Sequence, residues 1–424
     1  MLEFLKKHQR FFLFSLLLLG LILRITGLFF NGTFDMDPHL RWGTNTRVYG
    51  LAKGFEGLYF PIAYLIFAVA SFFSALIPKL WFLPIKFANQ IFEISTLILL
   101  IKLFPKKQFL ILLIYWLNPW FIIEGAWLGY FDAGMAFFLL SAGIYLNRLQ
   151  RANSFFVSGL LTSLALLIKP QVSGPLTVFF LFLLINFVLR KKFKETLTFT
   201  LGLAILPILF SIYFFISGKP IYYFAGWYTS LRFYMPSLNA NQVNIWYTIT
   251  RFIMYISGIT GPIYSLNTLY YPYSLLEKLS FAVFFIIAFL YVRQLKNISQ
   301  KHKISYLFLK LFAIGALLFP QIVTRSHENH FYNATILLTP LTLVNTRLLW
   351  PLIISEIFQF YNIFLRYGLG RDIRIPFGLN MDPLLSILGI LQFIITLRII
   401  YIFFSDGLHR RKLTIRHTFA KRTN

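Results

Sequence analysis

The chain has 424 residues, of which 58% are hydrophobic, with a mean hydropathy of +0.70 and a formal net charge of +26. A soluble protein of this length could not bury so much apolar surface. Runs of about 20 apolar residues, the length that a bilayer core requires, recur from end to end. The chain contains no cysteine, which excludes disulfides, a thiol nucleophile and cysteine-ligated metal. The composition therefore predicts an all-α, polytopic membrane protein.

Hydropathy predicts about 12 transmembrane helices. In chain order they cover residues 11–30, 84–104, 108–124, 133–148, 154–170, 172–189, 196–217, 277–295, 304–322, 332–348, 349–366 and 383–404. The first run is too long for the core of a signal peptide, and no small-residue cleavage site follows it, so we interpret it as a retained span.

Orientation follows from the basic residues. Lys and Arg form short clusters before the first span and between later ones, and with both termini in the cytoplasm every cluster faces the cytoplasm. Such clusters are typical of segments that set the orientation of a membrane protein and contact anionic lipid headgroups, so we expect no nucleic-acid partner. This topology predicts a multi-pass protein of a prokaryotic plasma membrane, or of the endoplasmic-reticulum membrane in a eukaryote.

Two apolar stretches, 60–78 and 240–270, fit this count only if they do not cross the membrane. We interpret both as interfacial or re-entrant helices on the outer face. The sequence then reads as one integral-membrane domain, 1–424. It has a first outer loop at 31–83, a second at 218–276 and a basic cytoplasmic tail at 405–424. Long ordered loops usually carry function.

The 14 carboxylates are few, and most of them map to the outer side of this topology. Glu93 falls inside a predicted span, where an ionisable group needs a partner, and we expect it to hydrogen-bond Asn89 or Ser95. If the chain carries out chemistry, the distribution of the acids places it on the non-cytoplasmic face.

The stretch NGTFDMDPHLRWG begins at Asn31, directly after the first span, and sets Asp35 and Asp37 two residues apart, shortly before Arg41. One interpretation is structural: an acid before Pro38 caps the start of a short helix. The other is catalytic: a carboxylate within hydrogen-bond reach of a hydroxyl can act as its general base. The spacing alone leaves both open.

Four more outer stretches carry candidate binding residues. RSHENHFYNA and LLIKPQVSGP hold cationic groups that suit phosphate oxygens. SLNANQVNIW holds asparagines and aromatic residues that suit sugar hydroxyls and sugar faces, and WLGYFDAG lies between the third and fourth predicted spans. The structural alternatives are a polar loop, a lysine that snorkels to the interface and an interfacial aromatic belt. The candidates are Asp132, Lys169, Asn239, Asn241, Arg325, His327 and Glu328.

These five stretches, taken in their order along the chain, resemble the motifs of the GT-C superfamily of polytopic glycosyltransferases that use polyprenyl-phosphate sugars. The similarity is greatest to the dolichyl-phosphate-glucose-dependent glucosyltransferases of the endoplasmic reticulum and to prokaryotic integral-membrane mannosyltransferases. Asp35, Asp37 and Trp42 reproduce the family spacing of an acid, a second acid two residues on and a tryptophan seven after the first. The chain departs from the family late in the first loop, where GLYFPIA stands in place of Asp-Tyr-Pro-Pro.

The resemblance implies a function. Asp35 would be the catalytic base of an inverting transfer of a hexose, mannose or glucose, to a glycan or glycolipid acceptor. Asp37 and Arg41 would help to bind or orient the substrates, and Lys169, Arg325 and His327 would hold the leaving phosphate. No cofactor is expected; a divalent metal is compatible with this reaction but not required. The seven histidines form no HxxxH spacing, which argues against a zinc site.

A transporter or lipid flippase is the alternative from another class. Transporters often show repeated halves with matching broken helices, and the sequence shows no such repeat. A structural membrane subunit, the third interpretation, would leave the outer carboxylates unexplained.

Overall fold

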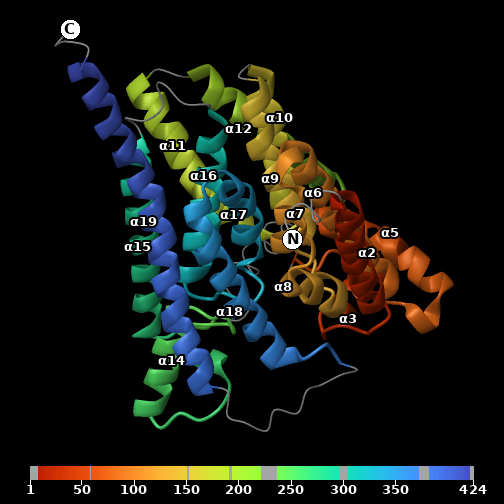
Figure 1. Ribbon diagram of the computed structural model, residues 1–424. Helices are drawn as coiled ribbons and strands as arrows, with labels where there is room; N and C mark the ends of the chain where they lie inside the picture. Colours follow the sequence, from red (N-terminus) through yellow and green to blue (C-terminus); the bar gives the residue numbers. More distant parts are fainter. Residues whose placement is uncertain are drawn as a thin grey trace.

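The computed structural model describes residues 8–57, 59–149, 152–190, 193–220, 236–295, 304–371 and 382–420. Within these ranges the regular elements are helices, and the extended pairing is limited to isolated β-bridges. Most helices run roughly alongside one another in a bundle (Figure 1). The predicted all-α class is confirmed for the described residues.

Each of the twelve predicted spans falls on a helical segment. In chain order they are α2 (Gln9–Leu28), α6 (Leu83–Leu103), a bent segment built from α7 (Gln108–Ile111), η3 (Leu112–Trp116), α8 (Pro119–Phe121) and η4 (Ile122–Leu128), then α9 (Ala133–Leu149), α10 (Ala152–Leu166), α11 (Ser173–Arg190), α12 (Phe193–Ile216), α15 (Tyr273–Leu295), α16 (Ile304–Ile322), α17 (Tyr332–Val344), α18 (Leu349–Tyr367) and α19 (Asp382–Ala420).

Length and apolar composition establish fewer spans than the sequence predicts. In the described part of the chain, 6 helices are long and apolar enough to cross a membrane, or 7 if the segment bent by 52° between Trp116 and Pro119 counts as one span. The remaining predicted spans are apolar helices of 10–17 described residues. A multi-pass helical membrane protein is thus supported, and the count of twelve stays a prediction.

Both stretches that we expected not to cross are short helices beside the bundle. The first loop folds into α3 (Met36–Tyr49), α4 (Leu51–Gly54), α5 (Pro61–Leu76) and η1 (Pro78–Leu80); the second contains α14 (Ile245–Ile256) and η6 (Ile263–Ser265). Residues 221–235 of the second loop lie outside the described residues. The predicted basic tail continues α19 as helix to Ala420, and its last residues, 421–424, are also outside them.

A buried ion pair joins α2 to α6. Arg24 Nε lies 2.9 Å from Glu93 Oε2, and the two side chains are 2% and 0% exposed. The expected hydrogen bond from Asn89 is present, but it reaches Glu93 Oε1 at 3.5 Å and is longer than the contact with Arg24. The prediction that Glu93 is satisfied locally was therefore incomplete, because its main partner comes from a helix 69 positions away.

Lys86, near the start of α6, fixes the ends of two other helices. Its buried ammonium donates hydrogen bonds to the carbonyls of Gly27, Phe30 and Trp127, at 3.1, 2.6 and 2.6 Å. Carbonyls at helix ends lack helical partners and carry partial negative charge, so a cation is favourable there. This contact sets where the chain leaves α2 and enters the first loop, and we call this end of the bundle the site end.

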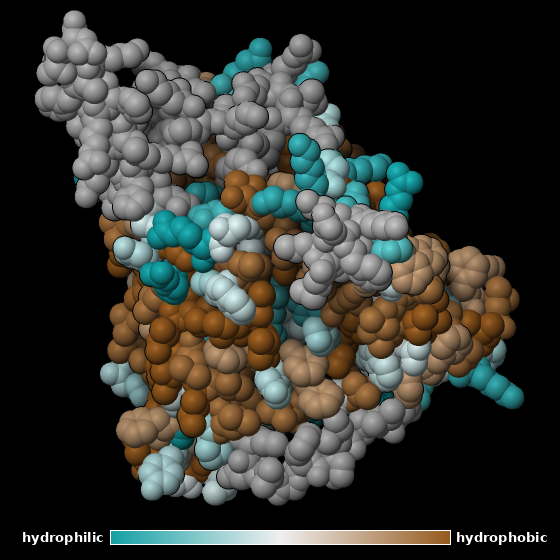
Figure 2. Space-filling view, viewed as in Figure 1, coloured by the Kyte–Doolittle hydropathy of each residue, from teal (hydrophilic) through white to brown (hydrophobic). Residues whose placement is uncertain are grey.

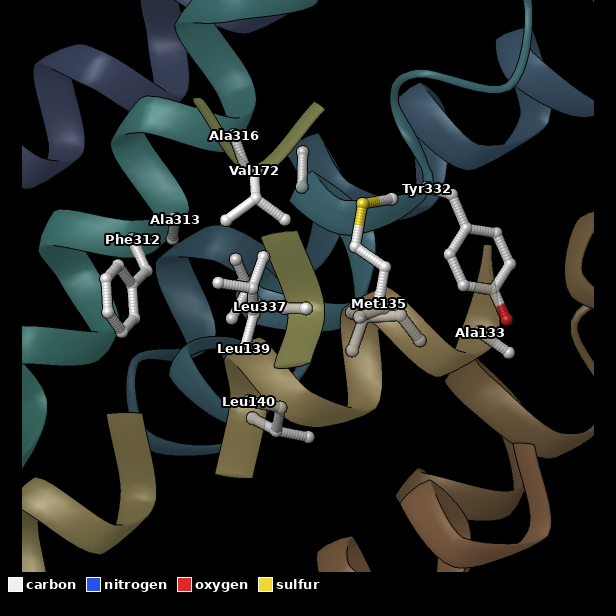
Figure 3. Close-up of a cluster of buried hydrophobic side chains, with 14 of the residues drawn as sticks. Ala133, Met135, Leu139, Leu140, Val172, Phe312, Ala313, Ala316, Tyr332 and Leu337 are labelled. Atoms are coloured by element: carbon white, nitrogen blue, oxygen red, sulfur yellow. The ribbon is translucent and has the colours of Figure 1, made fainter. Parts of the chain in front are cut away.

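The core beneath the site end is apolar and close-packed. Val172 of η5 (Pro170–Val172) lies among side chains of α9, α16 and α17 (Figure 3). The outside of the molecule shows a broad hydrophobic band, with hydrophilic side chains gathered mainly above it in Figure 2. A rigid, helical platform of this kind can hold loop residues in fixed positions.

Candidate functional site

A cavity of about 310 Å³ opens at the site end, and segments far apart in the sequence form its walls. The first loop and α3, the turn after η4, the stretch after α10, the second loop, α15 and the α16–α17 connection all contribute. Of the predicted site residues, those that line it are Asp35, Lys169, Asn241, Arg325, His327 and Glu328. The fold thus gathers six residues from four of the quoted stretches.

Asp35 stands at the turn into α3, and its carboxylate has no hydrogen bond within the described part of the chain. It occupies the N-cap position of the helix but makes no side-chain capping bond. The backbone beneath it is fixed, because Thr33 N–H donates to the Leu128 carbonyl at 2.9 Å. Gly32 adopts φ +83°, and a Cβ there would overlap the same carbonyl. A half-buried carboxylate on a fixed backbone is open to a ligand.

The electrostatic surroundings of Asp35 favour its neutral form. Burial and then the neighbouring Glu328 carboxylate raise the pKa of Asp35 to about 6, against the opposing charges of Lys169 and Arg371. A base whose pKa lies near the working pH combines a large ionised fraction with useful proton affinity. The acid expected to cap this helix was Asp37, before Pro38; the helix instead begins at Met36, so Asp37 lies within its first turn, and Asp35 at the N-cap position makes no capping hydrogen bond.

Two other residues of the same stretch point away from the cavity. Asp37 accepts hydrogen bonds from Arg371, at 3.2 Å to Oδ1 and 2.7 Å to Oδ2. Arg41 pairs with Glu56 at 2.8 Å. Glu56 also accepts from Trp42 Nε1 at 2.8 Å, which orients the indole that lines the cavity. These polar groups hold the first loop in shape rather than facing the cavity.

Lys169 reaches the cavity wall from an extended residue, because α10 ends three residues earlier at Leu166. Its Nζ lies 2.8 Å from Asp132 Oδ1, with both side chains 1% exposed, and 4.6 Å from the centroid of the Tyr59 ring. Asn329 donates to the other oxygen of Asp132 at 2.8 Å. Asp132 does not line the cavity; it holds Lys169 from behind.

Glu328 presents a second carboxylate to the cavity. Its Oε1 accepts hydrogen bonds from Tyr130 and Tyr367, both at 2.6 Å. Its Oε2 is buried and has no partner among the described residues. Tyr130 lies within a quoted stretch, but nothing in the sequence marked Tyr367, which comes from the distant end of α18.

Arg325, His327 and His330 form a further part of the cavity wall. Arg325 has φ +64° and makes a double contact with Glu277 of α15, at 2.7 and 2.9 Å. Burial lowers the pKa of His327 and, more strongly, that of His330, so both rings are neutral at pH 7. Neutral imidazoles can donate or accept hydrogen bonds, but they bring no charge to an anion.

The two asparagines of SLNANQVNIW have different places. Asn239 is fully buried and donates to the Gln242 carbonyl and to Asn244 Oδ1, at 2.9 and 2.8 Å. Asn241 lines the cavity, and its Oδ1 accepts from Arg366 at 3.0 Å. Asn239 therefore shapes the loop from inside, and Asn241 faces the space where a ligand would sit.

Two of the quoted stretches meet through their backbones. Ser326 carbonyl accepts from the N–H groups of Ala240 and Gln242, at 3.1 and 3.3 Å, and Arg325 N–H donates to the Leu238 carbonyl at 3.3 Å. These bonds tie the second loop to the α16–α17 connection. The sequence alone did not predict that SLNANQVNIW and RSHENHFYNA would pair.

His39, one helical turn beyond Asp35, belongs to an aromatic wall. Its ring stacks on Phe67 at 4.5 Å, and Trp42 and Tyr59 rings lie within 5.6 Å. Burial and the charge of Lys169 lower its pKa to about 3, so the ring is neutral. Aromatic faces beside polar groups are suited to sugar rings, which have apolar faces and hydroxyl edges.

The charges in and just behind the cavity wall do not sum to a simple cationic pocket. Lys169 and Arg325 are each paired with an acid, whereas Asp35 and Glu328 have no cationic partner in contact within the described residues. In the ranges that the structure describes, no three His, Asp or Glu side chains converge as ligands for a metal ion. The cavity offers oriented donors next to an available base.

Comparison with known proteins does not assign the chain to a family. A scan against protein-family models finds no match, and a search of curated proteins finds no similar sequence.

Proposed function

We propose that the chain is an inverting glycosyltransferase that moves a hexose, mannose or glucose, from a polyprenyl-phosphate sugar to a lipid-linked glycan or other cell-envelope acceptor. The observation that carries the proposal is the position of Asp35. Its carboxylate has no hydrogen bond among the described residues and shares one cavity with Lys169, Arg325 and two neutral histidines.

In the proposed reaction Asp35 takes the proton of the acceptor hydroxyl as that oxygen attacks the anomeric carbon. The bond from this carbon to the phosphate oxygen breaks, so the configuration inverts and polyprenyl phosphate leaves with the bonding electron pair. The N–H groups of Lys169 and Arg325 are already oriented by Asp132 and Glu277. Preorganised donors stabilise charge that develops on a leaving group without reorganising during the step.

A lipid-bound donor suits the other walls of the cavity. Phe281, Phe319 and Val323 line one side, and Phe281, in the long apolar helix α15, is 37% exposed. A prenyl chain can remain in the hydrocarbon beside such a wall while its phosphate and sugar enter the polar part.

The basic residues support a non-cytoplasmic site. Lys86 marks the site end of α6, and Lys102 follows sixteen residues later, about 24 Å along a helix. Lys107 contacts the Leu343 carbonyl, at the end of α17 remote from the cavity. If Lys102 and Lys107 face the cytoplasm, as the positive-inside rule predicts, the cavity faces the other side.

The test is a donor panel. Purified protein is placed in liposomes made from the total lipid extract of its own cells and given radiolabelled polyprenyl-phosphate mannose, glucose or arabinose. We expect one label to move from the donor to an acceptor in a product of inverted anomeric configuration. If no donor transfers label, the proposal fails.

A transporter or flippase is the second candidate, and one feature favours it. The segment bent by 52° near Asn118 and the buried Glu124, whose two oxygens have no partner among the described residues, resemble the broken helices and buried acids of transporters. The same liposomes distinguish the two: movement of intact labelled donor across the bilayer, with no new product, would favour the transporter.

A further inference from the structure

The segment that follows α18 folds back over the first loop. The backbone turns at Gly368 and Gly370, with φ +59° and +104°, and brings Arg371 to the loop. Arg371 N–H donates to the Gly32 carbonyl at 2.9 Å, and Gly370 packs on the same residue. Two segments far apart in the sequence are therefore in contact beside Asp35.

The Arg371 side chain continues this contact. Its guanidinium makes the double hydrogen bond to Asp37 and lies 4.8 Å from the centroid of the Phe34 ring. Planar two-point pairing restricts the geometry of both partners more than a single charge contact does. Asp35 lies between Phe34 and Asp37, so the contact fixes the backbone on both sides of the proposed base.

The same segment is also attached to the other cavity acid. Tyr367 begins the turn and donates to Glu328 Oε1 at 2.6 Å. Residues 367–371 thus connect the first loop, which contains Asp35, to the α16–α17 connection, which contains Glu328. Within the described chain, Asp35 has no side-chain bond of its own to set its position, so the position depends on its backbone.

We infer that residues 367–371 act as a positioning latch, in which Arg371, through Asp37 and Gly32, holds the loop at the geometry that Asp35 needs for proton transfer. The inference rests on the proposed glycosyl transfer, because it assigns a role within that reaction. Asp37 and Arg371 are positioning residues; neither touches the reacting atoms.

Exposure decides what losing the latch should change. The Arg371 and Asp37 side chains are 25% and 58% exposed, and exposed ion pairs contribute little to the free energy of unfolding. A displacement of about 1 Å of a catalytic group can instead cost about 10²-fold in rate. The latch should therefore affect the chemical step much more than the melting temperature.

The experiment compares Arg371→Gln, Asp37→Asn and the double variant in the liposome assay. We expect each single change to lower the single-turnover rate by about 10- to 100-fold, with donor KM nearly unchanged. The double variant should be no slower than the worse single one, since both remove the same contact. Arg251→Gln, which breaks an ion pair of 2.7 Å with similar exposure on α14, is the matched control and should stay near wild type.

The pH profile adds a readout that general loosening would not produce. The charged groups that act on Asp35 are Glu328, Lys169, Asp132 and Arg371, and His39 beside it is neutral. Because the Arg371 charge lowers the pKa of Asp35, Arg371→Gln should move the acid limb of the rate to higher pH. Asp37→Asn keeps the cation and should move the limb less.

Hydrogen exchange tests the latch without reference to activity. Amides of the peptide 31–40 should exchange faster in Arg371→Gln and not in Arg251→Gln. If wild-type protein transfers sugar but Arg371→Gln has the wild-type rate and the wild-type amide exchange, the latch is wrong and the proposed function stands. Additive rate losses in the double variant would also overturn the latch alone. If wild-type protein transfers no sugar, the proposed function fails, and unchanged exchange would then remove the latch as well.

Discussion

At the scale of single residues, the cavity separates groups that the sequence could not rank. Asp35 and Asp37 are two positions apart and chemically identical, yet one faces the cavity and the other binds Arg371. The difference arises from the turn into α3, which sends the two side chains in different directions. Of these two, Asp35 is the one placed to take a proton from a ligand in the cavity.

Replacing Asp35 by asparagine tests this role. The change keeps size and polarity but removes the base, so we expect single-turnover transfer to fall by about 10²–10⁴-fold, while donor binding survives. The variant and wild type must first be matched for thermal stability. Retention of more than about a tenth of the wild-type rate, against that expected loss, would remove Asp35 from the mechanism.

The pH dependence of wild-type protein provides a second residue-scale prediction. The raised pKa of Asp35, about 6, means that the active carboxylate form is lost as pH falls through that value. We expect kcat/KM to rise with pH with a midpoint near 6 and to lose this limb in Asp35→Asn. A wild-type profile that is flat from pH 5 to 8 would contradict the assignment.

At the scale of helices, buried cations decide how the elements fit together. Lys86 binds the ends of α2 and η4, and Arg24 binds α6, so both helices next to the first loop are held by charge inside apolar surroundings. Buried ionic groups are costly unless they are satisfied. These contacts therefore fix the positions of the helices that flank the first loop, and so the position of the loop that contains Asp35.

Lys86→Met should destabilise the protein because it removes the ammonium that donates to three carbonyls, of which Gly27 keeps the Phe30 N–H at 3.3 Å. A buried acceptor that loses its partner costs about 1–3 kcal/mol, so we expect a clear fall in melting temperature. Lys79→Met, which changes an exposed lysine in η1, is the control. Equal melting temperatures for the two variants would mean that the Lys86 contacts contribute nothing.

The Arg24–Glu93 pair predicts an unusual order of stabilities. Arg24→Met leaves a buried carboxylate without its cation and should cost about 3–5 kcal/mol, whereas the double variant with Glu93→Met replaces the pair by apolar groups and should be less destabilised. Thermal unfolding in detergent measures both. A double variant that is less stable than Arg24→Met would show that Glu93 is stabilised by other partners.

At the scale of the whole molecule, the bundle places the cavity at one end and the described lysines of the α6–α7 connection at the other. The chain has no native cysteine, so single cysteines report their location without background. Thr260, exposed beyond α14, and Lys106, exposed between α6 and α7, mark the two ends.

We expect an impermeant thiol reagent, added to intact cells, to label Thr260→Cys and to label Lys106→Cys only after permeabilisation. The reason is the cytoplasmic bias of basic residues in membrane proteins. Asn239 would be a poor reporter, because its side chain is fully buried. Labelling of Lys106→Cys from outside would place the cavity in the cytoplasm and contradict the proposed donor geometry.

The sequence by itself determined the class of the molecule and the positions of its helices. Long apolar runs have few stable alternatives to a helix in a bilayer, because each backbone N–H and C=O must be satisfied within the segment. Local signals also identified most of the stretches that line the cavity, such as Asp35, Lys169 and His327, because polar residues between apolar runs stand out.

Only the tertiary structure decided which polar residues face the cavity and which support it. Asp132 and Lys169 looked like two separate candidates but form one buried pair, and Asn239 is internal while Asn241 is not. Tyr367 and Arg371 reach the site from more than 300 positions beyond Asp35, after α18 has returned to the same end of the bundle. Such contacts depend on how the helices pack, and local sequence patterns do not show which distant segments the packing brings together.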